Sequence, residues 1–418
     1  MVPACSSVSA PRRTVRTVTS HPPRPEVMGR YPYPLALAIF LVQVALGILL
    51  FATFQQWVPG ELGAGDAWGG YLLGAYGGAR FLFETPTGAI SDRIERRLGL
   101  LLGFALMLPA IGLMSFARNE HLFLPLAAQL GFATAFLWPA TYAIAADLYE
   151  PDRRGKVIGF LNLAQLLGFG AGALAGAFMV ESSNVPQFAV AFVAVSLAFA
   201  AAVRGIPNYR GDRLFARVHT PARPSVRSIL SLRLAALSVI ILGASIALAM
   251  IVPAIRPYGQ HQLDVSFARL TVALIPAVIG GAALYIPAGH LADRYGRWKP
   301  LFAGQAFTVA GLLVIAGTGE LWVAVPAAMV VFAGNVLTVP AWNAAVMDLA
   351  PESHRGTLIG LSVALSGLGL AIGPALGGFV VGRWDAPAAF RVAAALAAVT
   401  AIAIVLYARH YAARPRTS

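Results

Sequence analysis

Residues 86–97 read PTGAISDRIERR, and residues 287–298 read PAGHLADRYGRW. The residues that recur are Gly88, Asp92, Arg93 and Arg96 in the first stretch and Gly289, Asp293, Arg294 and Arg297 in the second, each 201 positions later, as from 88 to 289. A second set keeps this offset, because Asp147, Arg154, Gly155 and Gly159 return as Asp348, Arg355, Gly356 and Gly360. A register shared over most of the chain predicts one succession of elements that occurs twice.

The composition indicates a polytopic membrane protein. Hydrophobic residues make up 58% of the chain and charged residues only 12%, whereas about a quarter of a soluble globule is charged. Apolar runs of roughly 20 residues can cross a hydrocarbon layer of ~30 Å. Twelve such runs occur, at 33–55, 68–89, 98–117, 122–146, 157–180, 187–203, 232–255, 267–288, 300–317, 321–346, 358–381 and 388–408. The sequence therefore predicts an all-α membrane protein with twelve transmembrane helices, six in each half.

The distribution of the net charge of +13 is a topology signal. Most of the 31 Lys and Arg residues lie before the first apolar run, after every second run, or in the C-terminal tail. The positive-inside rule then predicts a multi-pass protein with both termini in the cytoplasm, and we assign it to the plasma membrane, the inner membrane of a bacterium. No soluble fold or aromatic platform accompanies the charge, so we expect no nucleic-acid partner.

The segments outside the apolar runs differ in character. The predicted organisation is 1–30, a disordered cytoplasmic tail; 31–203, the first six-helix half; 204–231, a basic cytoplasmic linker; 232–408, the second six-helix half; and 409–418, a cytoplasmic tail. The first tail is rich in Pro, Ser, Thr and Arg, without periodicity, and either Met1 or Met28 is a plausible start of translation. The one cysteine, Cys5, excludes an internal disulfide and a cysteine-based metal site.

The two quoted stretches resemble the loop signature that follows the second and eighth helices of the major facilitator superfamily. Each copy follows the second apolar run of its half, and the resemblance covers residues 31–410. It implies two pseudo-symmetric six-helix bundles around a central cavity that opens alternately to each side of the membrane. It also implies a small-molecule substrate, membrane lipids as surroundings, a monomer and no cofactor. The loop signature does not indicate which substrate the protein carries.

The repeated loop residues are predicted to form a gate. A carboxylate at a helix end, such as Asp92 or Asp293, can lie against the positive N-terminus of a neighbouring helix, and Arg93 and Arg294 can reach carboxylates or phospholipid headgroups. Gly88 and Gly289 permit close helix approach. The alternative is that these arginines only follow the positive-inside rule, which is the interpretation we adopt for Arg96, Arg97 and Lys299. Asp147, Arg154, Asp348 and Arg355 are predicted to mark the corresponding helix ends of the second repeated set.

Arg80 and Glu84 form a charged pair inside the second apolar run. Four residues apart on a helix, they share a face and can pair. A lipid-facing charge near the bilayer centre costs about 2.5 to 3.5 kcal/mol on insertion scales, so both are predicted to face protein or a water-filled cavity. Three roles stay open: a proton-titrating Glu84 held by Arg80, an anion-binding Arg80 held by Glu84, and a structural ion pair.

Further polar side chains lie on the helices that line the cavity in the resembled family. These candidates are Gln43, Gln129, Trp138, Tyr142, Asn335, Trp342 and Asn343. Aromatic and amide groups with almost no charge suit an amphipathic or weakly polar ligand. For any one of them, helix packing and interhelical hydrogen bonding are the alternative.

Two departures from the family bear on the mode of transport. Proton-driven drug antiporters of the family carry an arginine four residues before a glycine in the fourth helix, and Ala127 occupies that position before Gly131. They also carry a GxxxGPxxGG run in the fifth helix. Residues 168–177 read GFGAGALAGA, and the full run appears instead at 369–378. Both runs are predicted to pack at the interface between the bundles.

These observations rank the possible functions. All seven histidines lie in tails, loops or helix ends, and no nucleophile or zinc motif appears, so we expect neither an enzyme nor a metal site. The preferred prediction is an exporter of small amphipathic solutes by alternating access, with protons as a possible coupling ion. The alternatives are a dedicated uptake or export carrier for a hydrophilic metabolite and a lipid flippase on the same fold.

Overall fold

The computed structural model describes residues 32–149, 151–182, 186–206, 232–349 and 355–412. The described residues are helical apart from short connections, and no strand occurs among them. The predicted tail 1–30, nearly all of the predicted linker 204–231 and most of the tail 409–418 lie outside this part of the chain. The all-α prediction is confirmed.

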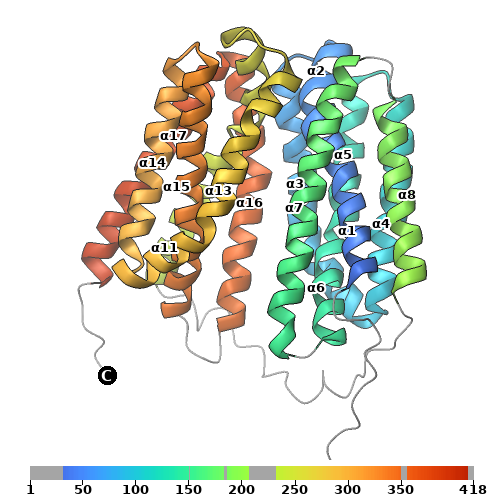
Figure 1. Cartoon of the computed structure of the whole chain (residues 1–418), viewed down its shortest axis with the longest axis horizontal. Coiled ribbons are helices and arrows are strands. Elements are labelled where there is room, and N and C mark those ends of the chain that lie inside the picture. The colour runs from blue at the N-terminus through green and yellow to red at the C-terminus, as the bar shows by residue number, and fades with distance from the viewer. Residues whose placement is uncertain (1–31, 150, 183–185, 207–231, 350–354, 413–418) are drawn as a thin grey trace, which may run out of the picture.

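The helices form two bundles that stand side by side (Figure 1). The first contains α1 (Tyr33–Leu46) with η1 (Gly47–Trp57) and α2 (Val58–Glu61), α3 (Ala67–Arg93), α4 (Arg96–Phe116), α5 (Glu120–Ala135) with α6 (Leu137–Leu148), α7 (Pro151–Ser182) and α8 (Gln187–Gly205). The second contains α11 (Leu232–Ala249) with η2 (Val252–Ala254), α12 (Ile255–Pro257) and η3 (Tyr258–Gln262), α13 (Phe267–Tyr295), α14 (Trp298–Gly317), α15 (Leu321–Leu349), α16 (Arg355–Arg383) and α17 (Ala386–Tyr407) with η5 (Ala408–Ala412).

Ten helices of the described chain are long and apolar enough to cross a membrane. Two of the twelve predicted crossings fall short of that standard. The helix α3 carries Arg80 and Glu84 within its length, and α13 contributes a shorter apolar stretch, Phe267–Gly280. Both are nevertheless long rods that run through their bundles beside the others (Figure 1).

Each bundle has its own apolar core. Phe54, Phe104 and Phe123 are fully buried in the first bundle. In the second, the ring of Tyr258 packs 5.1 Å from that of Phe390, and its hydroxyl donates to the carbonyl of Ile315 over 2.8 Å. A buried Tyr hydroxyl needs such a partner, because a polar group left unpaired in an apolar interior is costly.

The glycines of the α7 run pack inside their own bundle, which corrects the prediction for that run, whereas the α16 run packs both inside its bundle and, through Gly378, against Ala67 of α3. A Cβ on Gly172 of α7 would lie 2.1 Å from the carbonyl oxygen of Val44 in α1, and one on Gly377 of α16 would lie 2.0 Å from that of Met250, just beyond α11. In lipid, where tails are as apolar as side chains, such close backbone approach is a main source of helix association. The α7 run was predicted to lie between the bundles because small residues indicate close approach of helices without indicating which helix is the partner.

Replacing Gly172 by alanine will destabilise the first bundle, because no space exists for the added methyl group. Gly170→Ala is the matched control on the same helix, since a Cβ there meets nothing within 4 Å. We expect a lower Tm and a smaller monodisperse peak in size-exclusion chromatography for Gly172→Ala only. Equal values for the two variants would contradict this packing.

The bundles meet along α3 and α16. A Cβ on Gly70 of α3 would lie 2.3 Å from the carbonyl oxygen of Pro374 of α16, and one on Gly77 would lie 2.6 Å from that of Leu370. The glycines of α3 therefore supply the close contact between bundles. Further along α3 the contact loosens, since a Cβ on Gly367 would lie 3.6 Å from Phe81.

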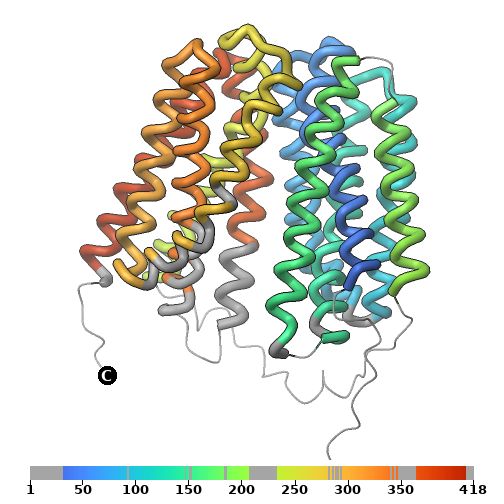
Figure 2. Tube along the Cα trace, in the orientation of Figure 1, coloured from blue at the N-terminus to red at the C-terminus, as the bar shows by residue number. Residues whose placement is uncertain are grey.

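The two ends of the molecule differ. We call the end that carries Tyr33 and Ala412 the inner end and the opposite one the outer end (Figure 1). The bundles approach each other at the outer end and diverge toward the inner end (Figure 2). After Phe81 one side of α3 becomes exposed, as at Leu82, which is 66% exposed, while Thr87 and Ser91 on the other side stay buried. On α7, Gly155 and Gly159 have nothing within 4 Å of an added Cβ.

Candidate functional site

A polar cluster joins the bundles at the outer end. Arg256 of α12 donates through Nε to Oε1 of Gln56 over 2.7 Å and through Nη1 to Oδ1 of Asp66 over 2.5 Å. The amide of Gln260 donates to the same Gln56 oxygen over 3.1 Å. The Arg256 side chain is only 11% exposed, so this charge-assisted pair is shielded from most of the solvent. We call Gln56, Asp66, Arg256 and Gln260 the outer cluster.

A second contact between bundles lies beside the outer cluster. The Glu181 carboxylate, at the end of α7, accepts a 2.8 Å hydrogen bond from the backbone N–H of Ala268, in the first turn of α13. An anion at a helix N-terminus satisfies a free N–H group and is favoured by the helix dipole. The rings of Phe51 and Phe267 pack next to it with centroids 5.2 Å apart.

Sequence reasoning missed these outer contacts. Gln56, Asp66 and Arg256 belong to no repeated motif, and the partners lie up to 204 positions apart. The one available signal was Arg256 itself, a cation close to an apolar run.

At the inner end of the first bundle, residues from the two repeated sets contact each other. Arg96 at the start of α4 forms an ion pair with Asp147 of α6 and donates to the carbonyl of Ala143 over 3.1 Å. Arg154 donates through Nε to the carbonyl of Tyr149 over 3.0 Å. Arg96 was predicted only to follow the positive-inside rule, and the structure gives it a defined partner. Arg96 and Asp147 recur at the same offset, as Arg297 and Asp348. This shared offset was the sequence signal that could have linked Arg96 with Asp147.

The predicted gate residues are only partly covered by the described structure. A Cβ on Gly88 would lie 3.5 Å from Pro139 of α6, so this glycine allows α3 to approach that helix. Arg294 lies with its guanidinium carbon 5.5 Å from the ring centre of Tyr295. The side chains of Asp92, Arg93 and Asp293, residue Gly289, and the side chains of Asp348 and Arg355 lie outside the described residues, so their roles stay predictions.

A helix break positions α6 beside α3. Proline 139 has no N–H to donate to the carbonyl of Ala135 one turn earlier, and α5 ends at Ala135 while α6 begins at Leu137. Thr87 of α3 supplies the missing donor, with its Oγ1 2.8 Å from that carbonyl oxygen. Tyr142 of α6 lies near Arg80 and Glu84 of α3, while Trp138, whose ring centroid is 6.0 Å from that of Tyr142, is buried in the core of the first bundle.

The charged pair of α3 lies on this same face of the first bundle. Arg80 Nη2 is 3.7 Å from Glu84 Oε1, and the two side chains are 30% and 33% exposed. Arg80 also interacts with Tyr76, and Tyr142 lies within electrostatic reach of both charges. The Tyr142 hydroxyl donates to Oδ1 of Asn162 on α7 over 3.1 Å. The structure thus brings Arg80, Glu84 and Tyr142 together, as one polar face formed by α3, α6 and α7.

Two of the predicted cavity residues pack inside the first bundle. Gln43 is buried against Gly168 of α7. The Gln129 amide points to α4, where it lies 3.4 Å from the carbonyl oxygen of Leu106. Their positions match the helix-packing alternative. The side chain of Asn343 lies outside the described residues.

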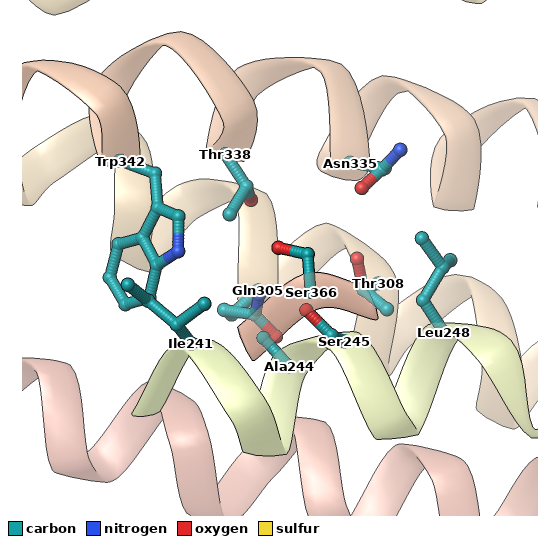
Figure 3. Close-up of a pocket in the computed structure, with 10 residues that line it drawn as sticks. All are labelled: Ile241, Ala244, Ser245, Leu248, Gln305, Thr308, Asn335, Thr338, Trp342 and Ser366. Atoms are coloured by element: carbon teal, nitrogen blue, oxygen red, sulfur yellow. The ribbon is translucent and has the colours of Figure 1, made fainter. Parts of the chain in front are cut away.

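A pocket of about 90 Å³ opens in the second bundle. Figure 3 shows it between α15 and α11, with side chains of α14 and α16 reaching into it. The predicted residues Asn335 and Trp342 line it, together with Ser245, Gln305, Thr308 and Thr338. Among the described residues that line this pocket, none is Asp, Glu, Lys or Arg. Within the described chain, no group of three or more His, Cys, Asp or Glu side chains is arranged to hold a metal ion.

Comparisons with known proteins place the chain in a family. The model of the Major Facilitator Superfamily matches residues 35–369 and 237–418. The tetracycline resistance protein, class H, of Pasteurella multocida is 23% identical over 331 residues, which are 76% of this chain and 81% of that protein. The proton-coupled antiporter flippase LtaA of Staphylococcus aureus is 24% identical over 316 residues, 72% of this chain and 76% of that protein.

The fold is that of solved members of this family. The crystal structure of a bacterial homologue of the human lysosomal transporter Spinster, in an inward-facing and occupied conformation, superposes with a TM-score of 0.75 at 13% identity. The match covers 93% of this chain and 98% of the other. Members of this family are transporters and not enzymes. The chain belongs to the Major Facilitator Superfamily and is an integral, multi-pass membrane transporter of a small molecule.

Proposed function

We propose that the protein exports small amphipathic organic solutes by alternating access, as a monomer in the inner membrane of a bacterium with both termini in the cytoplasm. The observation that carries the proposal is the difference between the two ends. The outer cluster and the Glu181 contact join the bundles at one end, while at the other end one side of α3 is exposed beyond Phe81. With cytoplasmic termini, this conformation admits a solute from inside.

The contacts at the outer end have the strength that a gate requires. Each hydrogen bond or partly screened ion pair is worth on the order of 1 kcal/mol. A few of them bias a two-state equilibrium without locking it, because a population shift needs only a few kcal/mol. The outer cluster and the Glu181–Ala268 bond therefore suit a contact that forms and breaks in every cycle.

The relatives favour export. One is named for resistance to tetracycline and the other is named a proton-coupled antiporter flippase. In this chain the aromatic and uncharged polar groups of the two bundles, Tyr142 on one side and Asn335 and Trp342 on the other, suit an amphipathic solute. A dedicated carrier for a charged metabolite would need a larger number of charged side chains.

Proton coupling is proposed for the Arg80–Glu84 pair. The position where the family's proton-linked arginine stands is Ala127, which is buried in the first bundle. Arg80 supplies a cation on the neighbouring helix α3, and Glu84 lies one turn away from it and partly exposed. The pair can therefore exchange a proton with water while Arg80 retains a charged or polar partner.

Transport into inside-out membrane vesicles tests the function. We expect uptake of a fluorescent amphipathic compound such as Hoechst 33342 when respiration acidifies the vesicle interior, and collapse of uptake when a protonophore is added. Vesicles from cells that lack the protein are the control. Accumulation in right-side-out vesicles instead would contradict export, and uptake indifferent to the protonophore would contradict proton coupling.

The loop motif provides a prediction independent of the substrate. Asp92→Asn removes the carboxylate that is proposed to face a helix N-terminus, so it will slow transport several-fold, matching a loss of about 1 kcal/mol. Folding will be retained because the helix end lies outside both apolar cores. Initial transport rates and size-exclusion profiles are the measurements, with Glu320→Gln as a control carboxylate. Wild-type rates in Asp92→Asn would remove the gating role.

Lipid flipping is the second candidate function. LtaA is named a flippase, and α3 exposes Leu82, Phe83 and Ile90 beyond the contact with α16. An apolar surface beside an opening suits acyl chains. Fluorescent lipid that moves between leaflets in proteoliposomes, without uptake of any soluble compound, would favour this function.

A further inference from the structure

We propose that the pocket in the second bundle is a subsite for an uncharged hydrogen-bonding group of the substrate, an amide or a hydroxyl. This inference rests on the transport function proposed above and names the class of solute. It starts from the chemistry of the lining, which combines several hydrogen-bonding groups with no charge. A charged group placed there would lose its water without gaining a counter-charge, at a cost of several kcal/mol.

The pocket is built by the close approach of two helices. A Cβ on Gly304 of α14 would lie 2.5 Å from the carbonyl oxygen of Gly334 on α15, so the two backbones nearly touch. Thr308 follows Gly304 by four positions and shares its side of α14, and Gln305, the residue after Gly304, also lines the pocket. The side chains of α14 therefore reach the space between α11 and α15 (Figure 3). They could not reach it if α14 lay farther from α15.

Several groups of the lining have no protein partner. Thr308 and Thr338 donate to the carbonyls of Gly304 and Gly334 in their own helices, which leaves their oxygens free to accept. Gln305 accepts from Thr400. In the described part of the chain, the amide of Asn335, the indole N–H of Trp342 and the hydroxyl of Ser245 make no hydrogen bond to protein. The pocket therefore presents both donors and acceptors.

Buried groups of this kind are expensive unless something pairs with them. Each unpaired buried donor or acceptor costs about 1–3 kcal/mol. Of the three groups without a protein partner, Trp342 is at least nine-tenths buried, whereas Asn335 and Ser245 are half-buried. The volume of about 90 Å³ is several times the roughly 10–15 Å³ that one water molecule requires, so a small polar group fits.

The first bundle shows that the fold does not need this polar pocket. At the offset of 201, Gln305, Thr308 and Thr338 correspond to Phe104, Met107 and Leu137, whereas Asn335 and Trp342 correspond to the buried threonines Thr134 and Thr141. These three apolar side chains are completely or almost completely buried, and Gly103 packs on Leu137 as Gly304 packs on Thr338. At these three positions the corresponding helix pair of the first bundle therefore closes well with apolar residues. Because the polar version costs stability and is not required for packing, we assign it to ligand binding.

The position of the pocket's rim would allow a solute to enter from the space between the bundles. Ser366 of α16 lines it, and the next residue, Gly367, faces Phe81 of α3 in the other bundle. Trp342 and Ile241 form an apolar side opposite the hydroxyls of Ser245 and Thr308 (Figure 3). A solute with an apolar body and an uncharged polar end matches this arrangement.

The test is ligand binding to the full-length protein in lipid nanodiscs. The probes are two panels of amphipathic compounds matched in size and octanol partitioning: neutral amides and diols, chloramphenicol among them, and quaternary ammonium or phosphonium cations. The variants are Thr308→Val and Asn335→Leu, which remove hydrogen-bonding groups at nearly constant volume. Thr53→Val is the control, because Thr53 is fully buried in the first bundle and also donates to its own helix.

We expect neutral compounds to bind the wild type and the Thr53→Val control alike. Their Kd will rise about tenfold in each pocket variant, as the loss of one hydrogen bond to a buried group predicts, while binding of the cations will not change. Thr308→Ser, which restores the hydroxyl, will recover the affinity even if Thr308→Val lowers the Tm. The proposal is overturned if no neutral compound binds, or if both panels lose affinity equally.

Binding and transport separate the two hypotheses. Selective loss of neutral ligands without vesicle uptake of any compound would leave the subsite in place and remove the export function. Robust uptake that is indifferent to Thr308→Val and Asn335→Leu would preserve export and remove the subsite.

Discussion

Covalent linkage of residue 66 to residue 256 will stop transport. Arg256 and Asp66 lie in different bundles and their side chains touch at the outer end. Alternating access requires them to separate once in every cycle. In a Cys5→Ser background, Asp66→Cys and Arg256→Cys joined by a short bis-methanethiosulfonate reagent should reduce vesicle uptake to below about a tenth of its rate, because the bundles can no longer part at this end.

The design carries its own controls. A reducing agent will release the link and restore the rate that the unlinked double variant shows. Tyr258→Cys with Thr318→Cys joins two residues that contact each other within the second bundle, and their link should leave transport unaffected. Continued transport by the protein linked between 66 and 256 would show that the outer cluster does not open.

Replacing Glu84 by glutamine will remove the dependence of transport on the proton gradient. Glu84 is the carboxylate that faces Arg80 on α3, and Tyr76 and Tyr142 are the other titratable groups beside them. Glutamine keeps the size and a hydrogen-bond acceptor for Arg80 but cannot release a proton. We expect uptake driven by an acidic vesicle interior to fall by about tenfold or more, as for the loss of a proton carrier, and the remaining uptake to vary little with pH.

Two comparisons decide the role of the pair. Exchange of substrate between equal concentrations on both sides needs no proton, so Glu84→Gln should retain it if the carboxylate carries protons. A structural ion pair would instead make Glu84→Gln fold poorly, with lower Tm and loss of exchange. Glu320→Gln, an exposed carboxylate at the outer end, should resemble the wild type in every assay. An unaltered pH profile in Glu84→Gln would assign proton coupling to another group.

Helix positions could be read from the sequence with small errors. The run 98–117 corresponds to Arg96–Phe116, and the run 321–346 to Leu321–Leu349. Apolar length and internal repetition report where a chain crosses a membrane, so these boundaries follow from local information. The same information predicted that α3 crosses the membrane, although Arg80 and Glu84 lower the mean hydropathy of this helix.

Partners between helices were harder to predict. The glycines of α7 were assigned to the wrong interface, since Gly172 meets Val44 inside its bundle. The pairing of Arg256 with Asp66 depends on how two bundles meet, which no local pattern encodes. Gln305 and Thr308 were not among the candidate cavity residues, because α14 reaches the pocket only through its close approach to α15.

The candidate site is more asymmetric than the repeated sequence suggested. The first bundle contributes a charged pair with Tyr142, and the second contributes an uncharged pocket with Asn335 and Trp342. The repeated loops explain why the halves share a fold. The unrepeated residues explain how one half could respond to protons while the other selects the solute.

The most direct test of alternating access is a pair of distances measured by electron–electron resonance on spin-labelled protein in nanodiscs. One pair replaces Leu98 and Lys299, at the inner ends of α4 and α14, and the other replaces Arg118 and Glu320, at the outer ends. Our account predicts that a bound substrate or a change of pH shortens the inner distance as it lengthens the outer one, and that Asp66→Asn produces the same shift. Two distances that stay fixed, or that change in the same direction, under conditions that support transport would contradict it.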